Sequence, residues 1–231
     1  MSLAPTTPHQ KLYGRHKGRP LSPRRTGLMA EVLPKLAIDL GKPAPPRLGD
    51  LFSGRPSTVE LEIGFGGGEH LIASAVRAPD RGFIGVEPFL NGMAKAVAAI
   101  VEGAIENVRL FGGDASELLD WLPPASLAAV DLLYPDPWPK RRHWKRRFVS
   151  PANLDRLARA LASGGRFRVA SDIPAYVEWT LGQLTSRSEF VWTAECADDW
   201  RLPFPGWEPT RYEAKAVAAG RVPTYLTFRR I

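Results

Sequence analysis

The fold of this chain is decided by the stretch Thr58-Val-Glu-Leu-Glu-Ile-Gly-Phe-Gly-Gly-Gly68. Its first six residues predict a buried strand, which has to end where Gly64 begins a glycine-rich turn. The segment that follows has apolar residues at helical spacing, namely Leu71, Ile72, Ala75 and Val76. A strand, a glycine turn and a helix in this order form the first unit of a β-α-β arrangement.

The same alternation continues toward the C-terminus. We predict strands over residues 58–63, 82–87, 108–111, 127–134 and 166–171, and helices over 71–76, 89–101, 116–122, 151–163 and 174–184. Two last strand-like runs, 189–197 and 222–229, have no long helix between them and are expected to form an antiparallel edge. The pattern predicts an α/β domain with a mostly parallel sheet and helices on both faces.

The first 50 residues differ from this pattern. Between Lys11 and Arg25 six residues are Lys or Arg and none is acidic, so the segment buries too little apolar surface to offset its ordering entropy. A short amphipathic helix is expected over 28–40. We therefore expect a basic, flexible extension, residues 1–50, before a folded domain, residues 51–231. The extension is either a solvated tail or an arm that settles on phosphates, and a second basic run favours the arm.

Composition narrows the class of protein. A net charge of +7 and a pI near 9.8 favour an anionic partner such as nucleic acid. The single cysteine, Cys196, fits a reducing compartment. No apolar run approaches the roughly 18 residues of a membrane span, and no secretory signal is evident, so we expect a soluble cytoplasmic protein. The histidines lack metal-ligand spacing, and no metal site is expected: His9, His16, His70 and His143.

Four carboxylates stand at the ends of successive predicted strands: Glu62, Glu87, Asp114 and Asp136. Ligands of parallel sheets bind beyond the carboxyl ends of the strands, so these side chains are expected at one edge. Each acid alone is also explained as the cap of a neighbouring helix. Four acids at consecutive strand ends favour a ligand site.

The glycine turn indicates what kind of ligand this edge holds. Its pattern is E-x-G-x-G-x-G, with Gly64, Gly66 and Gly68, instead of the G-x-G-x-x-G of dinucleotide sites. Carboxylates in and after the turn, Glu62 and Glu69, would repel a pyrophosphate at the helix N-terminus. They suit a cofactor with a positively charged end and no phosphate, such as S-adenosylmethionine. Ribose hydroxyls are then expected at Glu87 and the adenine edge near Asp114.

The stretch 133–148 places a carboxylate next to a cationic loop. Pro135 and Pro137 fix the backbone on both sides of Asp136, and a catalytic group benefits from such pre-organisation. Six cations follow within eight residues, residues 140–147, with Trp138 and Trp144 near them. Such a loop neutralises phosphates, and an exposed tryptophan stacks bases, although core packing is the expected role of Trp138.

Three stretches together closely resemble the bacterial tRNA (guanine-N7-)-methyltransferases: E-I-G-F-G-G-G at 62–68, P-D-P-W-P-K-R-R-H-W-K-R-R at 135–147 and T-R-Y-E at 210–213. The resemblance extends from about residue 58 to the C-terminus. It implies a Rossmann-like class I methyltransferase fold with a seven-stranded sheet. It also implies methyl transfer from S-adenosyl-L-methionine to N7 of guanine 46 in the variable loop of tRNA.

The resemblance further implies roles for individual residues. Cofactor contacts would be Glu62, Gly64, Gly66, Gly68, Glu87, Asp114 and Asp136, and Asp136 would also be the catalytic residue. Contacts to the substrate or to RNA would be Lys140, Arg142, His143, Trp144, Lys145, Arg146, Arg147, Asp172, Thr210, Arg211, Tyr212 and Glu213. Ser171 stands where Thr is usual, and Tyr212 where Phe is frequent. The expected partner is tRNA, without a membrane or an obligate protein partner, for a monomer or weak homodimer.

Three alternatives remain at this point. An exocyclic-amine methyltransferase holds its amino group with an Asp/Asn-Pro-Pro-aromatic corner, of which Asp136-Pro137-Trp138 has a part. A non-catalytic RNA-binding module would keep the fold without binding the cofactor, but the intact Glu62, glycines and Asp136 speak against it. A dinucleotide oxidoreductase is disfavoured by the glycine spacing.

Overall fold

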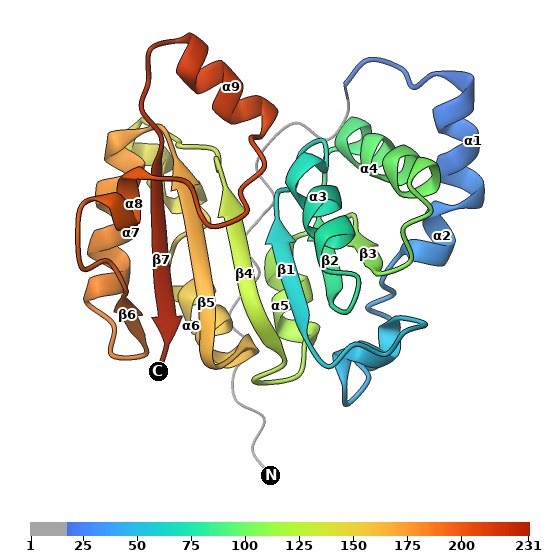
Figure 1. Cartoon of the computed structure of the whole chain (residues 1–231), viewed down its shortest axis with the longest axis horizontal. Helices are drawn as coiled ribbons and strands as arrows, with labels where there is room; N and C mark the ends of the chain where they lie inside the picture. Colours follow the sequence, from blue (N-terminus) through green and yellow to red (C-terminus); the bar gives the residue numbers. More distant parts are fainter. Residues whose placement is uncertain (1–17) are drawn as a thin grey trace.

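A seven-stranded sheet forms the centre of the structure, a computed structural model that describes residues 18–231 (Figure 1). Its strand order is β3-β2-β1-β4-β5-β7-β6. Strands β1 to β5 run parallel, whereas β7 is antiparallel to both β5 and β6. The strands are β1 Val59–Ile63, β2 Gly82–Val86, β3 Val108–Phe111, β4 Leu127–Leu133, β5 Leu161–Ser171, β6 Phe190–Trp192 and β7 Thr224–Arg230. The predicted parallel sheet with an antiparallel C-terminal edge is confirmed.

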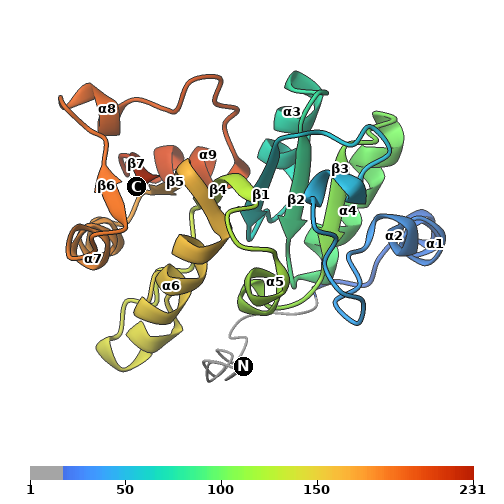
Figure 2. The ribbon, with the colours of Figure 1, turned by 90° about the horizontal axis from the view of Figure 1, so that it is seen from below.

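One face of the sheet is covered by three helices, α5 (Ala115–Trp121), α6 (Pro151–Ala160) and α7 (Pro174–Thr185) (Figure 2). Every second residue of the strands points into this layer, and a large apolar core results in which Leu61, Phe167 and Leu157 are buried. Burial of apolar area of this kind is the main force that holds the layers together. None of the helices in the described chain has the length and apolar character of a membrane span.

The opposite face is covered unevenly. Over β2 and β3 lie α3 (Glu69–Arg77), α4 (Leu90–Glu102), α1 (Pro23–Glu31) and α2 (Leu33–Leu36), around a second core that contains Phe83 and Val97. Over β4, β5 and β7 the cover is a loop that carries Phe204 and Trp207 (Figures 1 and 2). This loop lies between α8 (Asp198–Arg201) and α9 (Arg211–Ala218). The half of the face next to α3 is therefore closed by aromatic side chains instead of a long helix.

The N-terminal segment departs from its predicted form. Helix α1 begins at Pro23, where Ser22 caps it, and not near residue 28. It packs on α4, Arg24 pairs with Glu102 at 2.6 Å, and Ala37 forms a β-bridge with Leu110. Residues 18–50 thus lie against the domain, while residues 1–17 of the predicted flexible extension lie outside the described residues.

Two boundaries in the C-terminal half also differ. Helix α6 ends at Ala160, although Gly164 and Gly165 were expected to end it. Strand β5 begins at once, and Gly164, with φ of 78°, lies where pairing shifts from Leu127–Leu161 to Ala129–Arg166. The glycines serve a β-bulge and not a helix cap. The loop expected before the last strand contains α8 and α9 in addition.

Candidate active site

The turn between β1 and α3 has the backbone that its glycines predict. Gly64, Gly66 and Gly68 have φ of 72°, 60° and 85°, in the left-handed region that other residues avoid. A Cβ built on Gly64 would meet no atom within 4 Å, so the turn borders open space. Gly64 therefore leaves backbone at the carboxyl end of β1 that a ligand can approach closely, whereas a Cβ on Gly68 would be 3.0 Å from Cβ of Ala96 in α4.

Glu87 fixes this turn from the neighbouring strand end. Its two carboxylate oxygens accept hydrogen bonds from the backbone N–H groups of Gly66, at 2.6 Å, and Phe89, at 2.8 Å. Burial raises its pKa, with a smaller contribution in the same direction from Asp136, while both hydrogen bonds and the positive charge of Arg211 act against that rise. Asp136 and Arg211 are thus both close enough to Glu87 to affect its carboxylate.

Asp114 caps a helix, as the alternative interpretation of the acids proposed. Its Oδ1 accepts hydrogen bonds from both the backbone N–H and the hydroxyl of Ser116, each at 2.8 Å. Asp114 is the N-cap residue of α5, which begins directly after it. The carboxylate therefore stays at the carboxyl end of β3, where a ligand role in addition to the cap is compatible with its position.

Glu62 lies beneath the turn and not in it. Its Oε2 is 2.9 Å from Nδ1 of His70, which belongs to α3, and both side chains are buried. On the next strand Asp131 lies in register with Glu62, and Arg168 of β5 donates two hydrogen bonds to Asp131, at 2.6 and 2.5 Å. These four ionisable residues form a largely buried polar row from α3 across β1, β4 and β5.

His70, Asp131 and Arg168 were not among the site residues predicted from the sequence. The signal was present, because Asp131 interrupts an otherwise apolar strand and Arg168 lies on the neighbouring one. Burial raises the pKa of Glu62. Burial alone would lower the pKa of His70, but the hydrogen bond and negative charge of Glu62 outweigh it and hold that pKa above its usual value.

Asp136 stands on a strained corner. Tyr134 and Trp138, two residues to either side, have φ of 50° and 42°, a conformation that residues with a Cβ rarely adopt. The Asp136 side chain is exposed, and no partner for its carboxylate exists within residues 18–231. Surrounding protein still desolvates the carboxylate enough to raise its pKa. The corner therefore presents a fixed carboxylate that is available to a ligand.

Arg147 is not part of the exposed basic loop. Its side chain is 1% exposed and is enclosed by the rings of Trp144, Tyr176 and Trp179, at 4.9, 5.5 and 5.1 Å from its guanidinium carbon. Its Nε donates to the carbonyl of Pro137 at 2.9 Å. A guanidinium enclosed in this way is shielded from solvent, which disfavours the predicted RNA contact of Arg147. Arg147 instead anchors the corner that carries Asp136.

Of the remaining loop residues, some pack against the domain and others are exposed to solvent. Trp144 turns inward against Trp179, with ring centroids 5.4 Å apart, which disfavours the predicted stacking on a base. Trp138 supports Arg146, 4.8 Å above its ring, and contacts His143 edge-on. Desolvation and the cations around it lower the pKa of His143. The exposed cations of the loop are Lys140, Arg141, Arg142 and Lys145.

The T-R-Y-E motif contains two kinds of residue. Thr210 caps α9 by accepting a hydrogen bond from the N–H of Glu213, and both side chains are buried. Glu213 also accepts hydrogen bonds from Trp207 Nε1, at 2.5 Å, and the Tyr225 hydroxyl, at 2.7 Å. Since Trp207 lies against His70, with ring centroids 5.1 Å apart, the motif is joined to the Glu62 row. Thr210 and Glu213 hold the segment in place.

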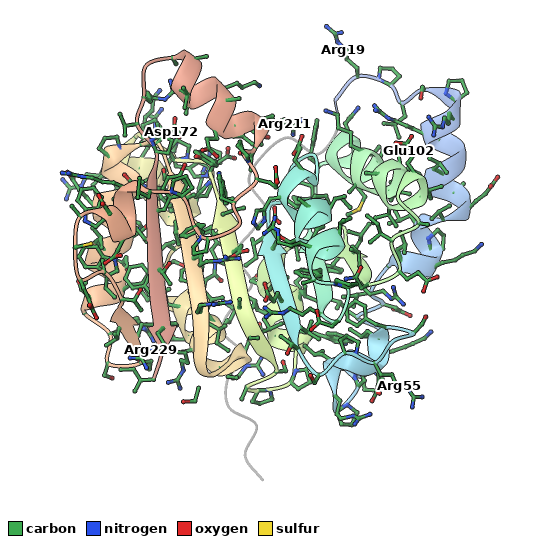
Figure 3. The ribbon with its side chains drawn as sticks, viewed as in Figure 1. Arg19, Arg55, Glu102, Asp172, Arg211 and Arg229 are labelled. Atoms are coloured by element: carbon green, nitrogen blue, oxygen red, sulfur yellow. The ribbon has the colours of Figure 1, made fainter. Side chains whose placement is uncertain are left out.

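The two middle residues of the motif lie over the glycine turn. A Cβ on Gly66 would be 3.0 Å from Cε2 of Tyr212 and 3.3 Å from Nη2 of Arg211. Figure 3 shows Arg211 where α9 approaches α3. Asp172, after β5, forms an ion pair with Arg221 farther along the edge. The structure thus brings the glycine turn, Glu87, Asp136 and Arg211 together and leaves Asp172 at the side.

This set of groups fits a zwitterionic cofactor. Carboxylates and the backbone of an open glycine turn bind ammonium and hydroxyl groups, and the Arg211 guanidinium can donate hydrogen bonds to a carboxylate. A pyrophosphate would face Glu69 and Glu87 at the helix N-terminus, so a dinucleotide does not fit. Within residues 18–231 no three His, Cys, Asp or Glu side chains form a metal-binding group.

Comparison with known proteins also indicates a methyltransferase. A family model described as "Putative methyltransferase" matches residues 56–225. Among solved structures, that of the 16S rRNA methyltransferase KamB is similar, with a TM-score of 0.56 and 19% identity, over 76% of this chain and 89% of that one. The fold and site define an S-adenosylmethionine-dependent methyltransferase of the class I fold.

Two relatives narrow the class further. A tRNA (guanine-N(7)-)-methyltransferase of Chelativorans sp. is 54% identical, over 96% of this chain and 96% of that protein. A protein of the same name from Rhodopseudomonas palustris is 56% identical, over 98% and 90%. The chain belongs to the tRNA (guanine-N(7)-)-methyltransferase family.

Proposed function

We propose that this chain methylates N7 of guanine 46 in the variable loop of tRNA, with Asp136 as its catalytic residue. The observation that carries this proposal is the Asp136 carboxylate on its strained corner, which has no hydrogen-bond partner within residues 18–231. Asp136 is close enough to Glu87 to affect its pKa, and Glu87 in turn binds the glycine turn. The exposed cations of the loop follow Asp136 in the sequence. A cofactor group, a fixed carboxylate and an RNA-binding surface therefore follow one another along the carboxyl edge of the sheet.

The chemistry needs alignment more than proton transfer. N7 of guanine already has an in-plane lone pair, so no base has to create the nucleophile. S-adenosylmethionine supplies the methyl group, whose bond to sulfur breaks as the bond to N7 forms, leaving S-adenosylhomocysteine. The chain's task is to hold N7 in line with that bond.

Asp136 has two ways to assist. The imidazole ring of guanine becomes positively charged as the methyl group arrives, and a preorganised carboxylate stabilises that charge. The same carboxylate can instead hold the N1 and N2 hydrogens of the base. Asp172 is the second candidate for either task, once Arg221 releases it.

The cofactor residues act in different ways. Gly64, Gly66 and Gly68 provide the close backbone surface, and Glu87 and Asp114 face the adenosine part. Glu62 acts through His70, because its carboxylate is already paired beneath the turn. This assignment keeps all predicted cofactor residues at the site but separates direct contacts from supporting ones.

The RNA surface consists of the exposed cations Lys140, Arg142 and Lys145, which neutralise phosphates and release counterions. His143 and Arg146 lie beside this surface, where both contact the ring of Trp138. Tyr212 closes the glycine turn from the substrate side. We propose that the enzyme acts in the cytoplasm, on tRNA alone, as a monomer or weak homodimer.

A comparison of two RNA substrates tests the proposal. The protein is incubated with labelled methyl donor and a tRNA transcript, or with the same transcript in which guanine 46 is changed to adenine. We expect label only in the first RNA, and Asp136→Ala to abolish most of it. Equal label in both RNAs, or near-normal turnover of Asp136→Ala, would contradict the proposal.

A further inference from the structure

Arg211 occupies a position that a contact to RNA does not explain. It is the first residue of α9, and its guanidinium lies over the glycine turn, 3.3 Å from the place of a Gly66 Cβ. Its side chain is 29% exposed. Its buried Nε has no hydrogen-bond partner within residues 18–231, and Oε1 of Glu69 lies 4.0 Å away as an ion-pair partner. A buried donor without a partner costs stability unless a ligand satisfies it. The guanidinium is therefore directed at the cofactor site and not at the outer surface.

The charges around this position favour an anionic group of the ligand. Glu69, Glu87 and Asp136 give the site a negative character, which suits the sulfonium and ammonium groups of the cofactor. The cofactor also has one carboxylate, which these acids would repel. Arg211 supplies the positive charge that this carboxylate needs, with the planar donors that bind carboxylates in pairs.

We propose that Arg211 binds the carboxylate of the methionine part of S-adenosylmethionine. Tyr212 holds the guanidinium in place, since its hydroxyl accepts from Nη2 at 3.2 Å and its ring lies 4.9 Å from the guanidinium carbon. The capped, buried ends of the motif fix the segment from both sides. This inference rests on the proposed location of the cofactor site, and it assigns Arg211 to the cofactor instead of the substrate.

A matched pair of ligands isolates the proposed contact. Calorimetry measures binding of S-adenosylmethionine and of decarboxylated S-adenosylmethionine, which lacks only the carboxylate, to the protein without tRNA. The wild type is expected to prefer the complete cofactor, and Arg211→Met to weaken that ligand about tenfold or more while leaving the decarboxylated one unchanged. Arg211→Lys is expected to restore part of the preference.

Two control variants separate the possible outcomes. Lys215→Met removes a neighbouring cation from the same helix and should change neither affinity. Glu87→Gln should weaken both ligands, because it acts on the glycine turn. An Arg211→Met protein that keeps the wild-type preference, or that loses only tRNA affinity, would overturn the inference. If Glu87→Gln also binds both ligands normally, the proposed cofactor location itself fails.

Discussion

Asp136 is the residue on which the rate should depend most. Asp136→Asn keeps its size and removes its charge, and we expect kcat to fall about 100-fold, as for other lost transition-state contacts. Binding of S-adenosylhomocysteine should change far less. Asp80→Asn, at another exposed acid, is the control and should leave kcat unchanged. A decrease that appears only in cofactor affinity would assign Asp136 to binding.

The raised pKa of Asp136 also predicts a pH dependence. Activity needs the charged carboxylate, so kcat should fall as the pH decreases through that pKa. Because desolvation raises the pKa of Asp136, the acid limb of the profile should lie above the ordinary aspartate pKa of about 3.9. The pH profile of kcat checks this, and the limb should be absent from Asp136→Asn. An unchanged limb in the variant would show that another group titrates.

Replacing Arg147 should lower stability, whereas replacing the exposed loop cations should lower tRNA affinity. Arg147→Met removes a buried guanidinium that donates to Pro137, so the free energy of unfolding should decrease by about 2–3 kcal/mol. The double variant Arg142→Ala, Lys145→Ala should keep its stability within about 0.5 kcal/mol. It should instead bind tRNA more weakly, with a slope of log affinity against log salt that is shallower by about 1 to 2.

Denaturant unfolding and a salt titration of tRNA binding measure the two effects. Normal stability of Arg147→Met, or an unchanged salt slope for the double variant, would refute the division of this loop.

The division of the loop into a buried and an exposed part was not predictable from the sequence, because Arg142 and Arg147 belong to the same run of cations. Only the aromatic rings that α7 brings to the loop distinguish them. Likewise, T-R-Y-E carried the signal of a helix cap, yet the burial of Glu213 depends on Trp207 and Tyr225.

At the scale of elements, the Glu62–His70 pair joins β1 to α3 and supports the glycine turn. His70→Ala leaves a buried carboxylate without its partner and should cost about 3–5 kcal/mol of unfolding free energy. Glu62→Gln combined with His70→Ala should cost less than the sum of the single changes. Additive costs in a double-mutant cycle would mean that the pair does not couple the two elements.

The same pair makes stability depend on pH. The pKa of His70 and that of Glu62 are both raised, so the folded state holds protons more tightly than the unfolded state does. The His70 contribution is therefore fully present below about pH 6.5 and is lost as the pH rises through the folded pKa. Denaturant unfolding at several pH values should show this decline in the wild type, and a decline of equal size in His70→Ala would contradict it.

Elements with a strong periodic pattern were predictable from the sequence, and β1, β3, α4 and α7 lie within a few residues of their predicted bounds. The errors have a common cause. Gly164 could end α6 or form a bulge in β5, and only the pairing with β4 decides between these roles. Helix α1 forms in a basic segment because its few apolar residues pack on the second core. Tertiary contacts thus override the local signal in both places.

At the scale of the molecule, all proposed functions lie along one edge of the sheet. The proposed cofactor groups lie at the ends of β1, β2 and β3, Asp136 follows β4, and the basic loop leads away from it (Figure 1). The segment with Trp207 and Glu213 returns from the C-terminal half and reaches His70 at the cofactor side. In the proposed assignment, this arrangement places a methyl donor and a polyanion side by side on one domain.

The central claim is tested most directly by locating the transferred methyl group. A full-length, otherwise unmodified tRNA transcript is methylated by the protein, and then reduced and treated with aniline, which breaks the chain at 7-methylguanosine. We expect one new break, at position 46, that depends on both the protein and S-adenosylmethionine. Methylated tRNA that does not break, with the label on an exocyclic amine, would contradict it.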